Sequence, residues 1–546
     1  MSPEMGSEPR DTRESLMRSA AVMTVGTALS RLTGFLRLTA MTATLGVTVS
    51  ALGSIYTVAN LTPNIVYELI LGGILTSVFV PVFVHRLETA GAEDAREVTD
   101  RLITLVLVIA VAIAALGALF AEPIIRLYLV TSHAPDREAQ IRLGVFFLRW
   151  FMPQIVFYAV GAVVIGLLQA HRRFAAPMFA PILNNLVVIG TFIAYAIVRG
   201  SRPPRVVGIT TAEETILAVG TTLGVVAMTV ALWPSLRSLG YRIRFHLDWR
   251  HEAIRRLVRL AAWVALYVAA NQLAYLLVIV LNNRFRAGPQ IYTTAFTVFQ
   301  LPHAIFAVSI FTALLPGMSE RWSVGRPDEV RTLVSRGLRD TAVVTIPAAI
   351  GLIVLAEPIV RLLFQHGEAL TRDSVAIART LQGFAVGLLF FSAFQLLTRS
   401  FYAMQDTRTP AIVNVGAACV NIGTAFLYTW VLPLGLRGMA LAHATSYVVG
   451  AALLFWLLRE RLGALDGARI ARTVAKVSIA AIVSGGAAFA ITELFKVPAT
   501  GEHLALQAAN VASAILVGML VFVISALILR VREVDDLRKA VLRRFR

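Results

Sequence analysis

The chain is poor in charge, in cysteine and in lysine. Only 15% of its 546 residues are charged, against roughly 25% in an ordinary soluble domain. The single cysteine, Cys419, excludes an intrachain disulfide framework. The three lysines, Lys476, Lys496 and Lys539, do not stand in a GxxxxGK[ST] phosphate loop, which excludes ATP hydrolysis by such a loop. The nine histidines show no HExxH or other zinc-ligand spacing. The sequence therefore predicts a protein that is not an enzyme and that needs no metal or cofactor.

Long apolar runs dominate the chain, which is 57% hydrophobic and has a mean hydropathy of +0.73. Many of these runs reach about 20 residues, enough to cross a hydrocarbon core about 30 Å thick. Backbone groups in that core must be satisfied within the segment, so each run should be a helix. The first run lacks a small-residue cleavage pattern, so we expect a retained helix rather than a signal peptide. We predict an all-α polytopic membrane protein with about 14 transmembrane helices. Their ranges are 19–46, 53–83, 101–121, 141–170, 175–199, 212–233, 254–281, 290–316, 337–356, 376–401, 409–432, 436–458, 471–494 and 503–530.

The net charge of +18 is unevenly distributed. When Lys and Arg are sorted by alternate loops, about 33 fall on one side of the membrane and about 12 on the other. The rich side holds the N-terminus, the connections 234–259 and 459–476, and the tail 530–546. The positive-inside rule then places both termini in the cytoplasm. Contact with anionic membrane lipids explains the excess charge better than nucleic acid does, and we expect no nucleic-acid partner.

One heptapeptide occurs twice, as AEPIIRL at 121–127 and AEPIVRL at 356–362. The match extends without a gap from 81–129 onto 316–364, and it pairs proline, arginine and glutamate as well as apolar residues. Chance similarity between apolar segments does not explain those polar matches. We therefore predict two parallel six-helix pseudo-repeats around a central cavity, followed by a C-terminal helix pair without a counterpart. The two heptapeptides should mark the outer ends of the third and ninth helices, as structural features rather than binding sites.

This organisation divides the chain into six parts. They are a cytoplasmic N-terminal leader (1–18), an N-lobe (19–235), a basic cytoplasmic connection (236–253), a C-lobe (254–458), the final helix pair (459–530) and a basic cytoplasmic tail (531–546).

The segment SRLTGFLR places two arginines inside the first predicted helix. Arg31 lies about 12 residues from the helix start, or roughly 18 Å along the axis, so it is near mid-membrane. Ionisable groups at that depth are costly and usually face a water-filled cavity. The guanidinium fork matches phosphate oxygens, and Gly34 allows close approach of a backbone or a substrate. Ser30, Arg31, Gly34 and Arg37 are therefore candidates for binding a diphosphate or another anionic head group. An ion pair with a carboxylate of a neighbouring helix is the structural alternative.

The second predicted helix contains LTPNIVYELILGG. Proline at position 63 removes a backbone donor and frees a carbonyl, and Asn64 can fill the opened hydrogen-bond ladder. Glu68 follows about one turn later, where it could neutralise Arg31 or Arg37 or carry a proton. Asn64 and Glu68 complete the set of candidate site residues.

Five segments carry a family resemblance: SRLTGFLR, PNIVYELILGGILTSVFVP, RRFAAPMFAPILNN, LLFQHGEALT and RSFYAMQDTRTP. They resemble signatures of the MurJ/MviN family of lipid II flippases, in the multidrug/oligosaccharidyl-lipid/polysaccharide exporter superfamily. The resemblance implies that the helices of 459–530 form a groove for a lipid tail. It also implies a bacterial cytoplasmic-membrane protein that moves lipid II, or a related polyprenyl-diphosphate glycolipid, to the outer leaflet by alternating access.

The resemblance also has gaps. Arg31 and Arg37 match the two arginines of the family's first helix. Three positions near which familiar members carry cavity charges hold neutral residues here, namely Ser54, Tyr67 and Thr297. The main hypothesis is a lipid II flippase. The alternatives are a flippase for another polyprenyl-linked glycan, a cation drug exporter of the same superfamily, or a non-transporting scaffold that recruits cell-wall synthesis proteins.

Overall fold

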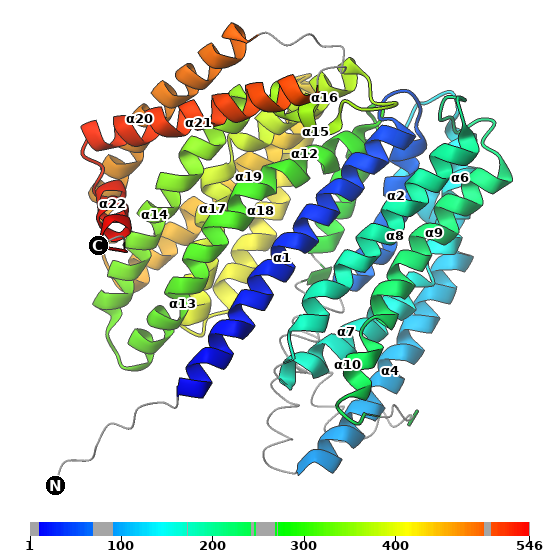
Figure 1. Ribbon diagram of the computed structural model, residues 1–546, viewed down its shortest axis with the longest axis horizontal. Coiled ribbons are helices and arrows are strands. Elements are labelled where there is room, and N and C mark those ends of the chain that lie inside the picture. The colour runs from blue at the N-terminus through cyan, green and yellow to red at the C-terminus, as the bar shows by residue number, and fades with distance from the viewer. Residues whose placement is uncertain are drawn as a thin grey trace. The chain divides into compact units, whose positions relative to one another are not determined.

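The computed structural model describes residues 10–68, 91–171, 173–241, 245–246, 268–269, 271–495 and 504–544. All regular secondary structure in these ranges is helical, which confirms the all-α prediction for them (Figure 1). The chain divides into two compact units, Met1–Leu273 and Ala274–Arg546. We describe each unit by itself.

Unit 1 contains α1 (Arg10–Leu45), α2 (Leu52–Glu68), α4 (Gly91–Leu119), α5 (Ala121–Tyr128), α6 (Arg137–Phe151), α7 (Gln154–Ala170), α8 (Ala175–Arg199), α9 (Thr211–Val230) and α10 (Trp233–Arg237). A short apolar helix, Asn271–Asn282, spans the boundary between the two units. Unit 2 then contains α12 (Gly288–Pro302), a π-helical turn (His303–Ala307), α13 (Val308–Ser323), α14 (Pro327–Val354), α15 (Ala356–Phe364), α16 (Thr371–Ala385), α17 (Leu388–Ala403), α18 (Arg408–Phe426), a second π-helical turn (Leu427–Val431), α19 (Gly435–Leu462), α20 (Gly467–Leu494), α21 (Leu504–Ile528) and α22 (Arg532–Arg544).

Ten helical segments in the described ranges are long and apolar enough to cross a membrane. The pair α16 and α17, bent by 48°, makes an eleventh. These segments confirm a multi-pass membrane protein. The predicted span 19–46 corresponds to α1, whose mean hydropathy is lowered by its arginines, and 53–83 and 254–281 lie partly outside the described residues. The count of about 14 helices stays a prediction.

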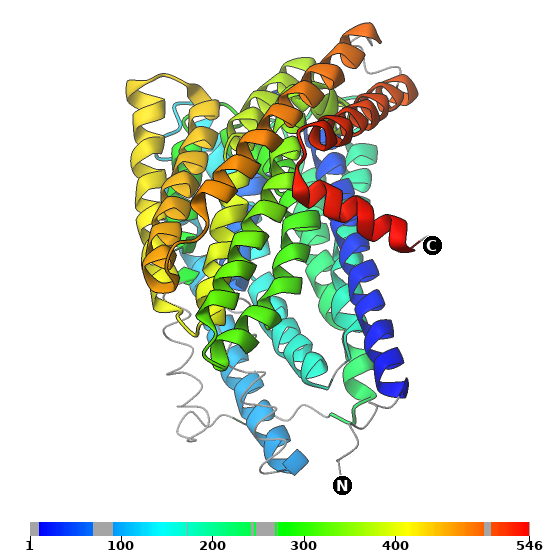
Figure 2. The ribbon, with the colours of Figure 1, turned by 90° about the vertical axis from the view of Figure 1, so that its left-hand side faces the viewer.

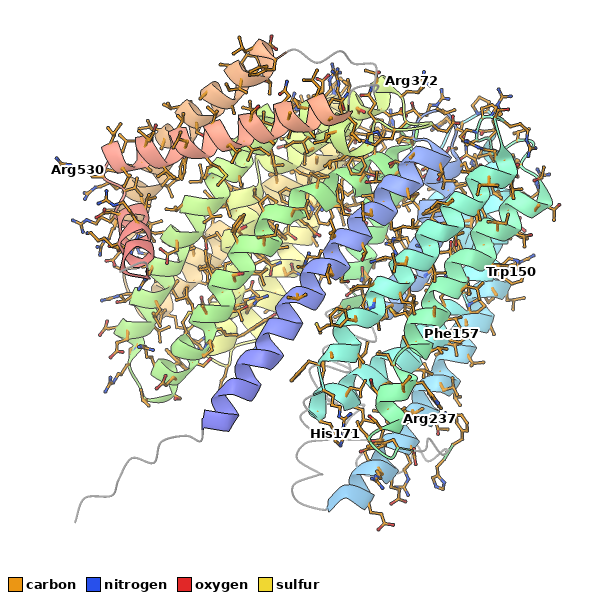
Figure 3. All side chains as sticks on the ribbon, in the orientation of Figure 1. Trp150, Phe157, His171, Arg237, Arg372 and Arg530 are labelled. Carbon is orange, nitrogen blue, oxygen red and sulfur yellow. The ribbon has the colours of Figure 1, made fainter. Side chains whose placement is uncertain are left out.

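The predicted helix 141–170 is divided into α6 and α7, next to Pro153. Proline cannot donate a backbone hydrogen bond, so it interrupts the ladder there. Two threonines of α9 bond to carbonyls on either side of the break: Thr222 Oγ1 donates to Trp150 O (2.8 Å) and Thr229 Oγ1 donates to Phe157 O (3.0 Å) (Figure 3). Hydroxyl groups of a neighbouring helix commonly satisfy backbone groups at such breaks. The break is thus held in place by α9.

Tyr56 of α2 is the centre of the apolar packing in unit 1. Its buried ring meets Phe147 and Phe151 of α6 edge to face at 6.0 and 5.6 Å, and Phe192 of α8 at 5.6 Å. Its hydroxyl lies 2.8 Å from Thr221 Oγ1 of α9. Edge-to-face pairs add to the free energy gained by burying the rings. One side chain therefore fixes α2 against three other helices.

The two heptapeptides adopt the same local structure, one in each unit. Each follows the end of a long helix and forms a separate short helix, α5 after α4 and α15 after α14. Within each, the arginine pairs with the glutamate four residues earlier: Arg126 with Glu122, and Arg361 with Glu357. The heptapeptide therefore starts a short helix after a break, and its arginine bonds within that helix.

The final helices pack on α14 in unit 2. A buried apolar cluster joins Ala342 and Ile346 of α14 to Val477 and Ala480 of α20 and to Ala526 of α21. Figure 2 shows α20 running across this face, with α21 and α22 beside it. A Cβ atom on Gly485 of α20 would lie 2.6 Å from Ile350 Cγ2, so the glycine permits the close approach of α20 to α14.

The helix α22 is fixed to α14 by a buried ion pair. Arg339 Nε lies 2.6 Å from Glu533 Oε1, and the two side chains are only 10% and 11% exposed. Arg339 Nη1 also donates to Ser335 Oγ (2.7 Å). The predicted tail 531–546 thus contains a docked helix.

Candidate substrate-binding site on the first two helices

Ser30 and Gly34 lie on the face of α1 that packs against α8. Gly26, Ser30 and Gly34 are four residues apart, so they share one helix face. A Cβ atom on Gly26 would lie 2.7 Å from Met178 Cβ of α8, and one on Gly34 would lie 3.5 Å from Asn185 Nδ2. Small residues at this spacing let two membrane helices approach closely. In this structure Gly34 therefore admits α8, and its role in binding a substrate stays a prediction.

Asn185 of α8 fixes the axial register of α1 against α8. Its amide donates to the carbonyl of Ser30 (3.2 Å) and to Thr33 Oγ1 (3.0 Å). At the C-terminal end of α1, Arg199 Nη1 donates to the carbonyl of Thr44 (3.2 Å). The segment with the two arginines is thereby held between polar contacts from α8.

Arg31 and Arg37 project away from this packed face to different degrees. Arg31 is exposed, whereas Arg37 is half-buried and lies near the Tyr56 and Tyr158 side chains. The two arginines are six residues apart, or about 9 Å along the axis, and point in directions about 120° apart. Neither forms an ion pair with Glu68, which is described and exposed, or with another carboxylate of the described ranges. The structural alternative of a neutralising carboxylate therefore finds no support within the described part of the chain.

The proline in α2 opens a polar position opposite Arg37. Pro63 is buried within the helix, and Asn64 Nδ2 donates to the carbonyl of Asn60 (2.7 Å). On the other side, Tyr158 Oη of α7 donates to Asn64 Oδ1 (3.4 Å). Asn60 Oδ1 is buried and finds no hydrogen-bond partner among the described residues. The segment around Pro63 thus presents the amide groups of Asn60 and Asn64, next to the Tyr158 hydroxyl of α7.

Tyr158 connects the groups on α1 and α2. It interacts with Arg37 and Asn64, and its ring lies 4.4 Å from the ring of Tyr67. We call Arg37, Asn60, Asn64, Tyr67 and Tyr158 the α1–α2–α7 polar cluster. Tyr158 was absent from the sequence-based candidates. Its only signal was a hydroxyl group in the apolar run QIVFYAVGAVV, which a membrane helix can equally place in a packed interface.

The three neutral residues near the family's charged positions occupy different surroundings. Ser54 is buried in α2, and the Tyr67 ring lies against the Tyr158 ring at a tilt of 34°. In unit 2, Thr297 Oγ1 donates to the carbonyl of Thr293 (2.8 Å). These positions supply no charge, so Arg31 and Arg37 are left to carry the anion binding predicted for unit 1.

Unit 2 presents aromatic rings instead of charges around α12. Tyr292, Phe296 and Phe299 of α12 pack on Phe384 of α16 with ring centroids 4.9 to 5.4 Å apart. His443 of α19 meets Phe384 edge to face at 5.4 Å. Among the described residues, no group of three or more His, Cys, Asp or Glu side chains could hold a metal ion.

Comparison with known families agrees with this architecture. A family model described as "Lipid II flippase MurJ" matches residues 41–508, a range that begins just after Arg37. The chain is 28% identical over 452 residues to a probable lipid II flippase MurJ of Rhizobium meliloti (strain 1021), covering 81% of this chain and 80% of the relative. It is 26% identical over 527 residues to a probable lipid II flippase MurJ of Rhizobium tropici, covering 95% of each.

Solved structures show the same fold. An inward closed conformation of the lipid II flippase MurJ superposes with a TM-score of 0.75 at 20% identity, covering 93% of this chain and 99% of that one. An inward-facing multidrug resistance MATE family transporter of the MOP superfamily gives a TM-score of 0.65 at 14% identity, covering 79% and 95%. Because the family model spans most of its length, this chain belongs to the lipid II flippase MurJ family.

Proposed function

We propose that this protein moves lipid II from the cytoplasmic to the outer leaflet of the bacterial cytoplasmic membrane by alternating access. The observation that carries the proposal is the pair Arg31 and Arg37 on α1, two guanidinium groups without a carboxylate partner in the described ranges. The named relatives support lipid II as the substrate. They favour it over another polyprenyl-linked glycan, a cation drug or a scaffold role.

The polar cluster suits a phosphorylated glycolipid head group. A head group that crossed bare hydrocarbon would lose the hydration of its charges at prohibitive cost. Guanidinium groups form charge-assisted, bidentate hydrogen bonds with phosphate oxygens. Arg31 and Arg37 would hold the diphosphate, and Asn64 and Tyr158 would offer hydrogen bonds to the adjoining sugar. Glu68, exposed at the end of the described part of α2, would border this region.

We extend the proposal to the whole chain. Two six-helix parallel repeats, an N-lobe (19–235) and a C-lobe (254–458), would rock around a cavity, with both termini in the cytoplasm. The break and short helix found once in each unit support this duplication. Residues 459–530 would hold the lipid tail in a groove, since α20 and α21 present exposed apolar side chains such as Ile482, Leu516 and Leu520. Basic cytoplasmic segments would contact anionic lipids and cell-wall synthesis proteins.

The first prediction tests anion capture. In a strain depleted of its own flippase, the Arg31→Ala/Arg37→Ala double variant should fail to restore growth, because the diphosphate loses two charge-assisted contacts. Lipid II should then remain inaccessible to labelling from outside the cell. Arg237→Ala on α10 is the matched control and should restore growth, because this arginine covers the Trp233 ring and belongs to no candidate site. Normal growth of the double variant at normal expression would show that these arginines do not bind the substrate.

A further inference from the structure

A cavity of about 300 Å³ lies in unit 2 at the point where α14 breaks into α15. Four parts of the chain contribute polar groups to its wall. Glu357 and Arg361 come from α15, Gln382 from α16, Glu493 from α20, and Gln507 and Asn510 from α21. The wall also contains apolar side chains, among them Val354 and Phe489. The cavity belongs to a different unit from the arginines of α1.

Two buried polar atoms in this wall have no hydrogen-bond partner among the described residues. Asn510 is 9% exposed; its amide donates to the carbonyl of Phe495 (2.5 Å), and its Oδ1 is unpartnered. Arg361 pairs with Glu357 through Nη2, while its Nε is buried and unpartnered. Buried polar groups are normally satisfied, because an unmade hydrogen bond keeps its full desolvation cost. A ligand that both donates to Asn510 and accepts from Arg361 would remove that cost.

The charges of the wall select the kind of ligand. Among the described residues, one arginine and two glutamates line the cavity, so a simple anion would meet more negative than positive charge there. A group with a phosphate and an ammonium fits this set, because the phosphate can accept from Arg361 and the ammonium can donate to the carboxylates and to Asn510 Oδ1. The volume is at the small end of the range for ligand sites. It suits a head group rather than a whole lipid.

The surroundings indicate that the ligand has an acyl tail. Phe489 and Leu494 on α20 and Leu504 and Leu506 on α21 are exposed near the cavity end of the two helices. In a membrane these side chains face hydrocarbon chains. A lipid could therefore place its tails along α20 and α21 while its head group enters the cavity.

The other heptapeptide provides an internal comparison. In α5, Arg126 pairs with Glu122 (2.9 Å) and with Glu138 of α6 (3.3 Å), and its side chain is 44% exposed. No helices equivalent to α20 and α21 cover it in the described part of unit 1. In unit 2, by contrast, α21 packs against α15, and the second heptapeptide lines the cavity.

We propose that the cavity between α15, α16, α20 and α21 binds the zwitterionic head group of an aminophospholipid. Arg361 holds its phosphate, and Glu493 and Asn510 hold its ammonium group. The site lies in the outer leaflet on the predicted topology. The head-group cavity does not include the arginines of α1, but the phospholipid tails would share α20 and α21 with the proposed substrate tail, so phospholipid retention is measured without added lipid II.

The experiment measures which lipids the full-length protein retains. The protein is reconstituted in an equimolar mixture of phosphatidylethanolamine, phosphatidylglycerol and phosphatidylcholine, and the bound lipid is identified by native mass spectrometry. Phosphatidylethanolamine should be enriched, since the quaternary ammonium of phosphatidylcholine cannot donate a hydrogen bond. Arg361→Gln and Glu493→Gln should each lower the enrichment roughly tenfold, the effect of one charge-assisted hydrogen bond.

Arg126→Gln is the matched control, because it breaks the equivalent ion pair in α5 and should leave the enrichment unchanged. Asn510→Leu fills the cavity without changing its charge and should also abolish enrichment. All variants are compared only as monodisperse protein, and Asn510→Ala replaces Asn510→Leu if the latter does not fold. Enrichment of phosphatidylglycerol, retention of a polyprenyl diphosphate in place of phospholipid, or equal enrichment in Arg361→Gln and Arg126→Gln would each overturn the proposal.

Discussion

At the scale of single residues, neighbours in the SRLTGFLR segment serve different purposes. Ser30 and Gly34 face α8, whereas Arg31 and Arg37 point elsewhere. Sequence alone placed all four in one candidate site, because spacing along a helix does not say which face meets a neighbour. The residue that links the polar cluster, Tyr158, comes from a distant helix and had no motif to reveal it.

The second prediction separates packing from substrate contact on α1. Gly26→Ala should lower the melting temperature of the purified protein, because the added Cβ would lie 2.7 Å from Met178 Cβ. Gly34→Ala should leave the melting temperature nearly unchanged, since its Cβ would make an ordinary 3.5 Å contact with Asn185 Nδ2. Loss of complementation by Gly34→Ala at unchanged stability would instead indicate that a substrate approaches this glycine.

At the scale of helices, most ranges follow from hydropathy, but the breaks do not. The predicted range 175–199 coincides with α8, while 141–170 and 376–401 are each two helices. Both breaks lie inside apolar runs, so hydropathy does not change there. The loop in RSFYAMQDTRTP is likewise fixed by local bonds: Asp406 accepts from Thr409 N and Oγ1 (3.0 and 2.8 Å) and pairs with Arg461. Burial would raise the pKa of Asp406, but these hydrogen bonds outweigh it and hold that pKa below its usual value.

The third prediction concerns the docking of α22 on α14. Glu533→Gln should destabilise the protein by about 3 kcal/mol, because Arg339 would remain buried without its counter-charge. The double variant Arg339→Met/Glu533→Leu should recover most of this loss, since it removes both charges. Thermal unfolding of the single and double variants completes the cycle. Equal stability of Glu533→Gln and the parent would mean that α22 is not held by this pair.

At the scale of the whole molecule, the sequence predicted the fold class and the family from composition, hydropathy and motifs. Composition indicates a membrane protein because repeated apolar runs of about 20 residues match the thickness of a bilayer's hydrocarbon core. The match between AEPIIRL and AEPIVRL predicted equivalent positions, and both copies form a short helix after a break. It could not predict that AEPIVRL lines a cavity, because that depends on which helices pack over it.

The fourth prediction tests the parallel arrangement of the two halves. In a Cys419→Ala background, single cysteines replace the exposed residues His133, Leu370 and Asp536. His133→Cys and Leu370→Cys, which follow α5 and α15, should react with a membrane-impermeant maleimide in intact cells. Asp536→Cys in α22 should react only after permeabilisation. Labelling of His133→Cys and Leu370→Cys from opposite sides would rule out parallel repeats.

The close seam between α1 and α8 has a mechanical consequence. Gly26 fits against Met178, Asn185 bonds to Ser30, and Arg199 bonds to Thr44, so the two helices are joined along much of their length. Packed helices joined in this way shift together rather than slide freely. If α1 moves and displaces Arg31, α8 should therefore move with it as a rigid pair. A spectroscopic probe attached to the loop after Arg199 should then report movements of α1, and Arg31 and Arg37 themselves would not be modified.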